Sequence, residues 1–354
     1  MELKAKYRLE LVTFAIITIM INYKTESSYG LQMKNLNYKT YTENKVTKDD
    51  EDESLIFNQE SVVGDIKNSN AYKVYKDFFK RVDYSSNKNF IIPGLTSCMV
   101  PQGMCDTKDY ILVSAYDKGK INNSCIYLIE KSTGKLIKTV YLYNSKSHVG
   151  GIACDGRYVW VGNGKEGTVS KLLLSEIINS KDGDYIKHYK HLVKNEKGEK
   201  VRPTFATYSN GVLWLGQFEK SEDSYVYGYD TSSANSPKFK LTAKYKINIP
   251  KQIQGITFDK LGRLILSQSY GRNFDSRIYI YDNLDYNLKD NVYHGILSTP
   301  TIIKAPPTSE NIFVGDDNLL YVLFESAADF YRNGRDNKGK AQTPVDRVWP
   351  INLQ

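Results

Sequence analysis

The sequence predicts an all-β protein folded as a β-propeller, with five blades favoured and six as the alternative. The first observation is a motif that returns five times, in which an apolar strand with a small polar cluster at its start is followed by a tight turn and a second apolar strand. The second observation is the spacing, since the copies start roughly 46–56 residues apart, as expected for one four-stranded blade per repeat. The copies occupy residues 101–116, 148–164, 202–218, 253–269 and 309–326.

The residues after each copy supply the remaining strands of a blade. After the first copy, residues 124–131 and 135–143 alternate apolar and polar positions on either side of a Ser-Thr-Gly turn, which predicts a hairpin. Residues 224–230 and 277–282 predict the third strands of their blades. The second repeat departs from this pattern, because residues 168–178 are also compatible with a helix.

The last repeat stops after its third strand, which we expect at residues 345–352. Residues 89–95 are mostly apolar and are expected to supply the missing fourth strand. Pairing the two ends in this way would close the ring and leave no exposed edge. A sixth, degenerate blade would have to be hidden in residues 286–306 or before residue 89.

The residues before the repeats predict three further segments. Residues 1–28 read as a signal peptide or an N-terminal anchor, because basic residues precede an uncharged apolar run that is too short to span a bilayer. Residues 29–54 read as a disordered polar and acidic linker. Residues 55–88 contain apolar side chains at helical spacing and predict a short helical segment before the propeller at residues 89–354.

This N-terminal pattern predicts a protein that is secreted or held at the cell surface. Export with cleavage is favoured, and an uncleaved anchor, which would be the chain's contact with a membrane, is the alternative. The formal charge is +8, but basic and acidic residues are interspersed and no basic run is interleaved with aromatic residues, so nucleic-acid binding is not expected. We expect an unknown extracellular ligand or protein as the partner.

The chain has four cysteines, and an even number in an exported protein permits two disulfides in three pairings. Cys105 and Cys154 lie on predicted inner strands, where a free cysteine also packs well as a small apolar side chain. We expect Cys98 with Cys105 to be the first pair to test, and Cys125 completes the set.

The five copies align so that one polar position stands at the start of each inner strand and another at the end of each second strand. The two strands of a hairpin are antiparallel, so both positions are expected on one face of the propeller, around the mouth of its channel. Concave mouths of this kind commonly bind ligands. The predicted ligand-binding residues are Gln102, His148, Arg202, Thr204, Gln254 and Glu310 at the starts, and Asn163, Gln217, Gln268 and Glu325 at the ends.

Two functions are compatible with this polar mouth. We favour a non-enzymatic binding or interaction module that recognises a small ligand, a glycan or a partner protein, and that needs no cofactor. The alternative is a metal-assisted hydrolase or lyase that uses His148, Glu310 and Glu325 with a divalent cation such as calcium. No catalytic residue is assigned, because the same side chains would also serve to satisfy backbone groups around a water-filled channel.

Other recurrent residues have structural interpretations. Trp160 and Trp214 occupy equivalent second-strand positions and are expected to pack one blade against the next. Residues 324–333 leave the fifth hairpin and are expected to lie over the mouth as a short helix. Three of the predicted inner strands have a glycine near their start, at Gly103, Gly151 and Gly255. The blades are closest together near the axis, so a side chain at these positions is expected to clash.

Four motifs of the chain resemble those of a family of exported, propeller-like proteins from low-GC Gram-positive bacteria. They are VPQGM at residues 100–104, SHVGGIA at 147–153, FESAA at 324–328 and VDRVW at 345–349. The resemblance covers residues 100–352, and it implies a propeller fold and export but no particular activity.

The inner strands are also distantly similar to those of NHL-repeat propellers and gluconolactonase-like hydrolases. The hydrolases hold a divalent metal at the channel with Glu, Asn and Asp side chains. Glu310 and Asn163 are the matching positions in this chain, and no Asp stands opposite them.

Overall fold

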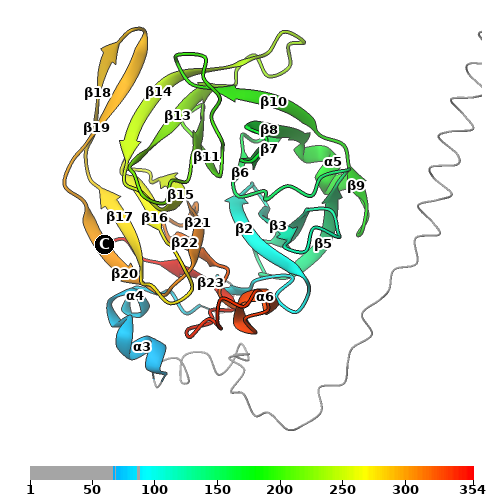
Figure 1. Cartoon of the computed structure of the whole chain (residues 1–354), viewed down its shortest axis with the longest axis vertical. Helices are drawn as coiled ribbons and strands as arrows, with labels where there is room; N and C mark the ends of the chain where they lie inside the picture. Colours follow the sequence, from blue (N-terminus) through cyan, green and yellow to red (C-terminus); the bar gives the residue numbers. More distant parts are fainter. Residues whose placement is uncertain (1–66, 68, 86–87) are drawn as a thin grey trace, which may run out of the picture. The chain divides into compact units, whose positions relative to one another are not determined.

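The computed structural model describes residues 67, 69–85 and 88–354. Within these residues, the strand pairings form five successive four-stranded antiparallel groups, which follow the five repeats of the sequence (Figure 1). The first group consists of β2 (Met99–Asp106), β3 (Tyr110–Asp117), β4 (Cys125–Glu130) and β5 (Leu136–Leu142). The second consists of β6 (Ile152–Cys154), β7 (Tyr158–Asn163), β8 (Thr168–Leu173) and β10 (Tyr189–Lys194).

The other three groups repeat this arrangement. The third group consists of β11 (Phe205–Ser209), β12 (Val212–Gly216), β13 (Ser224–Asp230) and β14 (Leu241–Ile249). The fourth consists of β15 (Ile253–Phe258), β16 (Leu264–Gln268), β17 (Ser276–Tyr281) and β20 (Thr301–Ala305). The fifth consists of β21 (Ser309–Val314), β22 (Leu320–Phe324), β23 (Arg347–Ile351) and β1 (Phe90–Ile91).

The first strand of each group lies innermost, and these five strands surround a common centre. β2 contacts β6, β6 contacts β11, β11 contacts β15, β15 contacts β21, and β21 returns to β2 (Figure 1). The hairpins therefore radiate from one axis, and the predicted all-β propeller fold is confirmed.

Glycines allow this close approach of the inner strands. A Cβ atom added to Gly151 on the approach to β6 would lie 2.4 Å from the backbone nitrogen of Ala206 on β11. One added to Gly255 on β15 would lie 2.6 Å from the carbonyl oxygen of Glu310 on β21. Both distances are shorter than side chains tolerate, so the prediction that these positions need glycine is confirmed.

The N-terminal part of the described chain closes the ring. β1 pairs with β23 in antiparallel register, with Phe90 opposite Val348, as predicted for residues 89–95. The predicted helical segment is present as two short helices, α3 (Asn70–Val74) and α4 (Lys76–Lys80). From α4, Phe78 packs edge-on against Phe324 of β22, and Phe79 packs edge-on against Trp349 of β23. Helix α4 therefore packs on β22 and β23 of the fifth group.

Two segments differ from simple four-stranded repeats. Residues 168–178 are neither all strand nor all helix, because β8 ends at Leu173 and α5 (Leu174–Asn179) follows directly. After α5, β9 (Tyr185–Ile186) pairs with β5 in parallel. The segment proposed for a sixth blade instead contains β20 and most of a hairpin, β18 (Leu284–Lys289) with β19 (Val292–Leu297), which adds to the edge of β14.

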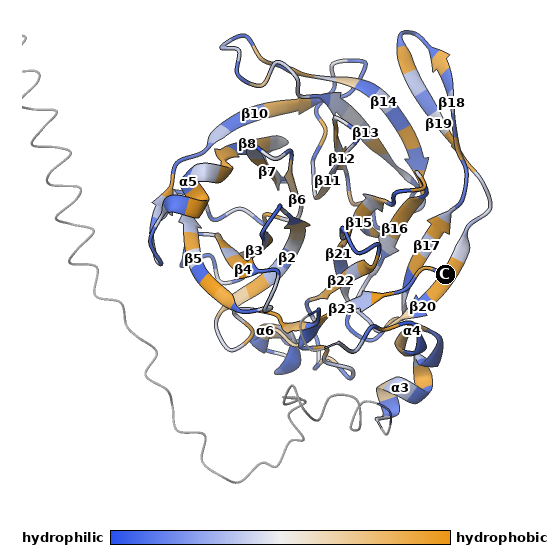
Figure 2. Cartoon of the chain, turned by 180° about the vertical axis from the view of Figure 1, so that it is seen from behind, coloured by the Kyte–Doolittle hydropathy of each residue, from blue (hydrophilic) through white to orange (hydrophobic). Residues whose placement is uncertain are grey.

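Aromatic side chains fill the spaces between neighbouring groups, as predicted. Trp214 on β12 of the third group packs on Phe258 at the end of β15 in the fourth group, with ring centroids 5.1 Å apart. Trp160 on β7 of the second group packs on Phe239, which precedes β14 of the third. Apolar and polar residues alternate along outer strands such as β14, which keeps one face of the strand buried (Figure 2).

The cysteine pairing expected from the sequence is wrong. All four cysteines are free thiols, and Cys98 directly precedes β2, whereas Cys105 is the last but one residue of that strand. Seven extended residues span about 23 Å, whereas a disulfide needs Cα atoms within about 7 Å of each other. These two cysteines therefore cannot bridge.

The predictions for residues 1–66 lie outside the described residues, including the signal or anchor at residues 1–28 and the linker at residues 29–54. Among the residues that the structure describes, no helix has the length and apolar character needed to cross a membrane.

Candidate functional site

Three of the predicted mouth residues meet where the first and fifth groups adjoin. Gln102 lies on β2, Glu310 lies on β21, and Glu325 directly follows β22. The Gln102 Nε2 atom donates to Glu325 Oε2 over 2.6 Å, and a hydrogen bond joins the two carboxyl groups. Gln102 and Glu310 are only 2% and 4% exposed, whereas Glu325 is half-buried. The repeat pattern predicted this convergence.

Three residues that the sequence did not single out complete this arrangement. Tyr331 on α6 (Asp329–Arg332) interacts with Glu325 and Tyr116, and its hydroxyl accepts from Lys118 Nζ over 2.5 Å. Tyr116 and Lys118 lie at the end of β3 and just after it. The only sequence signal for Tyr331 was the expectation that residues 324–333 lie over the mouth. We call the following residues the mouth cluster: Gln102, Tyr116, Lys118, His148, Glu310, Glu325 and Tyr331.

A second loop holds α6 in place. Arg272, between β16 and β17, forms an ion pair with Asp336 and donates to the carbonyl oxygen of Gly339. Its guanidinium also lies over the ring of Tyr331, 4.6 Å from the centroid. The loops that follow β16 and β22 are therefore tied together next to the mouth cluster.

The two carboxyl groups have different protonation states. Burial raises the pKa of Glu310 well above its ordinary value, and the negative charge of Glu325 raises it further. Burial also raises the pKa of Glu325, but Lys118, Gln102 and Tyr331 favour its ionised form. Glu325 is therefore the carboxylate of the pair, and Glu310 is the neutral acid that donates to it.

His148 lies beside Tyr116 of the mouth cluster. The two ring centroids are 4.4 Å apart, and His148 is an exposed residue. The surrounding protein lowers the pKa of His148 to about 4, mainly by desolvation and to a smaller extent through the charges of Lys118 and Lys120. His148 is therefore neutral at pH 7, with one ring nitrogen able to donate and the other able to accept.

The other predicted residues are not joined to the mouth cluster by hydrogen bonds. Asn163 accepts from Ser147 Oγ over 2.8 Å and donates to Ser170 Oγ over 2.8 Å. Gln268 donates to the carbonyl oxygen of Lys251 and accepts from the hydroxyl of Tyr279, both over 2.9 Å. Asn163 and Gln268 therefore fit the alternative interpretation, in which polar side chains at strand ends satisfy neighbouring polar groups of the protein.

The residues of the third hairpin bond mainly within their own hairpin. The side-chain oxygen of Thr204 accepts from the backbone of Phe218 over 2.7 Å. Gln217 accepts from the backbone of Arg202 over 3.1 Å and donates to Glu219. Gln254, at the start of β15, is half-buried, and none of the described residues hydrogen-bonds its side chain.

The Glu310–Glu325 pair makes stability depend on pH. The folded state keeps a proton on Glu310 at pH values where the unfolded chain has lost it. The contribution of Glu310 to stability is therefore greatest below pH 4.5, the ordinary pKa of this side chain, and falls as the pH rises toward the folded-state pKa. The limiting loss is about 1.4 kcal/mol per pH unit.

We expect Glu310→Gln to remove most of this slope, because an amide donates to Glu325 at every pH. Urea unfolding at a series of pH values measures the slope. Glu222→Gln, at an exposed position between β12 and β13, serves as the control and should keep the slope of the wild type. Equal slopes for the wild type and Glu310→Gln would contradict the assignment of the shared proton.

His148, Glu310 and Glu325 do not come together as a metal site. Among the residues that the structure describes, no group of three or more His, Cys, Asp or Glu side chains is placed to hold a metal ion.

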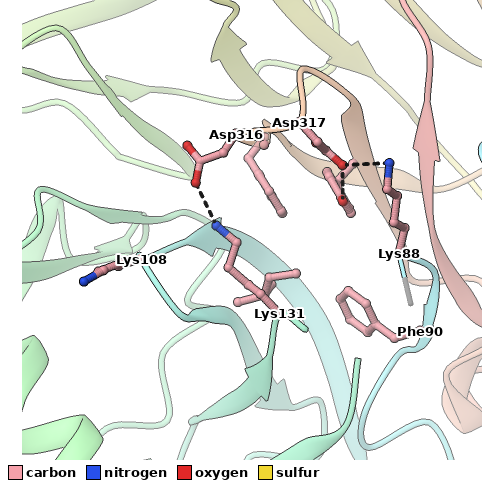
Figure 3. A pocket seen from close by; sticks show the side chains of 10 residues that line it. Lys88, Phe90, Lys108, Lys131, Asp316 and Asp317 are labelled. Carbon is pink, nitrogen blue, oxygen red and sulfur yellow. Dashed lines mark hydrogen bonds and ion pairs between the residues drawn. The ribbon is translucent and has the colours of Figure 1, made fainter. Parts of the chain in front are cut away.

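A cavity that the sequence did not predict lies at the other end of the same seam. Its volume is about 270 Å³, and turns after β2, β4 and β21 contribute to its walls (Figure 3). Lys131 pairs with Asp106 at 2.9 Å and with Asp316 at 3.2 Å, while Lys88 pairs with Asp317 at 3.4 Å. Of these ion pairs, the one between Lys131 and Asp316 joins the first group to the fifth. Lysines and aspartates in turns look like ordinary solvated residues in the sequence, so no signal marked the cavity.

No protein-family model matches this chain, and no curated protein matches it. Among solved structures, glutaminyl cyclase of Myxococcus xanthus is similar with a TM-score of 0.45 at 10% identity, over 75% of this chain and 95% of that chain. A streptogramin B lyase is similar with a TM-score of 0.35 at 12% identity, over 75% and 97% of the two chains. A putative oxidoreductase (glucose dehydrogenase) of Thermus thermophilus has a TM-score of 0.39 at 11% identity, over 75% and 100%. These are propeller-type proteins, and similarities of this size carry no conclusion about function.

Proposed function

We propose that the protein is an exported binding module that holds a small polar ligand at the channel mouth, beside His148. The observation that carries the proposal is an exposed, neutral histidine that lies against Tyr116, whose other neighbours include the Glu310–Glu325 carboxyl pair. Buried groups with shifted pKa values gather at functional sites more often than elsewhere. Export is proposed from the N-terminal sequence pattern alone.

The chemistry of the mouth cluster supports a ligand that both donates and accepts hydrogen bonds. His148 offers one donor and one acceptor, and Lys118 offers an ammonium group that is half-buried. Tyr116 supplies an aromatic surface beside the imidazole. A hydroxylated molecule of the size of a sugar matches these groups, because its hydroxyl groups donate and accept and its C–H faces pack on aromatic rings.

A panel of monosaccharides and oligosaccharides, titrated by calorimetry, tests the proposal. We expect His148→Ala and Gln254→Ala to weaken binding of any sugar that binds the wild type by at least about tenfold. Both variants should melt close to the wild type, because none of the described residues hydrogen-bonds either side chain. His294→Ala, at a half-buried histidine on β19, is the matched control and should bind normally. Binding that His148→Ala leaves intact would refute the location, and no binding across the panel would refute the ligand class.

A further inference from the structure

Two of the four free cysteines lie at the C-terminal ends of neighbouring inner strands. Cys105 is the last but one residue of β2, and Cys154 is the last residue of β6. These two strands contact each other at the centre of the ring, and one belongs to the first group and the other to the second. Cys105 is buried, whereas Cys154 is partly exposed.

Gly103 on β2 and Ile152 on β6, each two residues before one of the cysteines, lie in contact and place Cys105 opposite Cys154. A Cβ atom added to Gly103 on β2 would lie 3.0 Å from both the backbone nitrogen and a side-chain carbon of Ile152 on β6. β2 and β6 are the equivalent strands of consecutive groups, so they run in the same direction around the ring. Side chains return to the same face of a strand every second residue. Two residues beyond Gly103 and Ile152, the facing positions are Cys105 and Cys154.

We propose that Cys105 and Cys154 form a disulfide that joins the first group to the second when the protein is in an oxidising compartment. Cys154 is also among the groups that raise the pKa of Cys105, after the larger effect of burial, which agrees with this placement. Of the remaining cysteines, Cys98 is among the charges that act on Cys125, so the proposed pairing leaves these two thiols as the other pair among the three pairings that four cysteines allow.

The reaction needs an oxidant, for which a small disulfide such as oxidised glutathione suffices. The Cys154 thiolate attacks one glutathione sulfur, which forms a mixed disulfide and releases one glutathione thiolate. Cys105 then loses its proton to solvent and attacks the Cys154 sulfur, which releases the second glutathione. The two protein thiols are oxidised by two electrons, and one glutathione disulfide is reduced to two thiols.

The environment of the pair sets when this bond forms. Burial raises the pKa of Cys154 to about 11, and the nearby carboxylates of Asp106 and Asp155 add to this effect. Burial raises the pKa of Cys105 as well. Because the thiolate is the reacting species, oxidation of the folded protein at neutral pH is slow, and the bond forms readily only while the chain folds.

The test refolds the full chain in a glutathione redox buffer, blocks free thiols with N-ethylmaleimide and maps the product without reduction. Cyanogen bromide cleaves after Met99 and Met104, which separates Cys98 from Cys105. Trypsin then releases residues 105–108 and residues 147–157. We expect these two peptides to appear as one linked species, with a mass 2 Da below the sum of the reduced peptides.

Two variants keep the test decisive. Cys98→Ser/Cys125→Ser retains the proposed pair, so it should still give the linked species and should melt several degrees higher when oxidised than when reduced. Cys105→Ser/Cys154→Ser should lose both the linked species and this shift. Full alkylation of Cys105 and Cys154 after oxidative refolding, or a link from either residue to another cysteine, would overturn the proposal.

Discussion

Phe90→Ala is expected to lower the free energy of unfolding by about 3–5 kcal/mol. Phe90 is 2% exposed and lies on β1, the strand that pairs with β23 and closes the ring. It belongs to the core that holds the first and fifth groups together, and it forms part of the wall of the cavity at their seam. Truncation would therefore both enlarge a cavity and loosen the closing strand.

Ile91→Ala is the matched control for this variant. Ile91 lies on the same strand but is 49% exposed, and it pairs with Arg347 through the backbone. We expect a loss of less than about 1 kcal/mol from this change. Urea unfolding of both variants measures the difference, and equal losses would mean that β1 does not anchor the ring through Phe90.

Gly151→Val is expected to cost about 3 kcal/mol, at the upper end of the usual cost of overpacking. A Cβ atom at this position would lie 2.4–2.6 Å from backbone atoms of Phe205 and Ala206. Backbone cannot rotate away as a side chain can, so β11 would have to move, and its whole group with it. Thermal and urea unfolding measure the loss.

Gly119→Ala is the comparison for this substitution. Gly119 lies in an exposed turn, and its added Cβ would meet only side-chain atoms, the nearest being an oxygen of Asp117 at 3.2 Å. We expect a change within about 0.5 kcal/mol. A Gly151→Val variant as stable as Gly119→Ala would show that the inner strands have room to separate.

The fold was predictable because its repeats carry the same local signals. The polar start of each inner strand, the turn and the second apolar strand recur at blade spacing, and the missing fourth strand pointed to residues 89–95. Residues 168–178 were ambiguous because their run of leucines suits a buried strand and a helix equally. The hairpin of β18 and β19 was missed because it leaves its own group and joins β14, and local patterns do not report such a partner.

The sequence could predict only those residues of the candidate site that lie at the ends of the repeated strands. Alignment of the repeats placed Gln102, Glu310 and Glu325 together, and the structure joins them. Asn163 and Gln268 occupy equivalent ends, but their partners Ser170 and Tyr279 lie on third strands, which the alignment did not consider. Tyr331 lies on α6, in the segment between β22 and β23, and the repeats do not determine the path of this segment.

The pairing of Phe90 with Val348 also constrains the order in which the molecule assembles. Synthesis delivers β1 first and its partner β23 last, so the growing chain forms an open arc before it can form a ring. Until β23 is made, β1 and β22 each lack the partner that β23 provides. Unpaired strand edges can pair with other chains, so the arrival of β23 removes two edges at which the chain could aggregate.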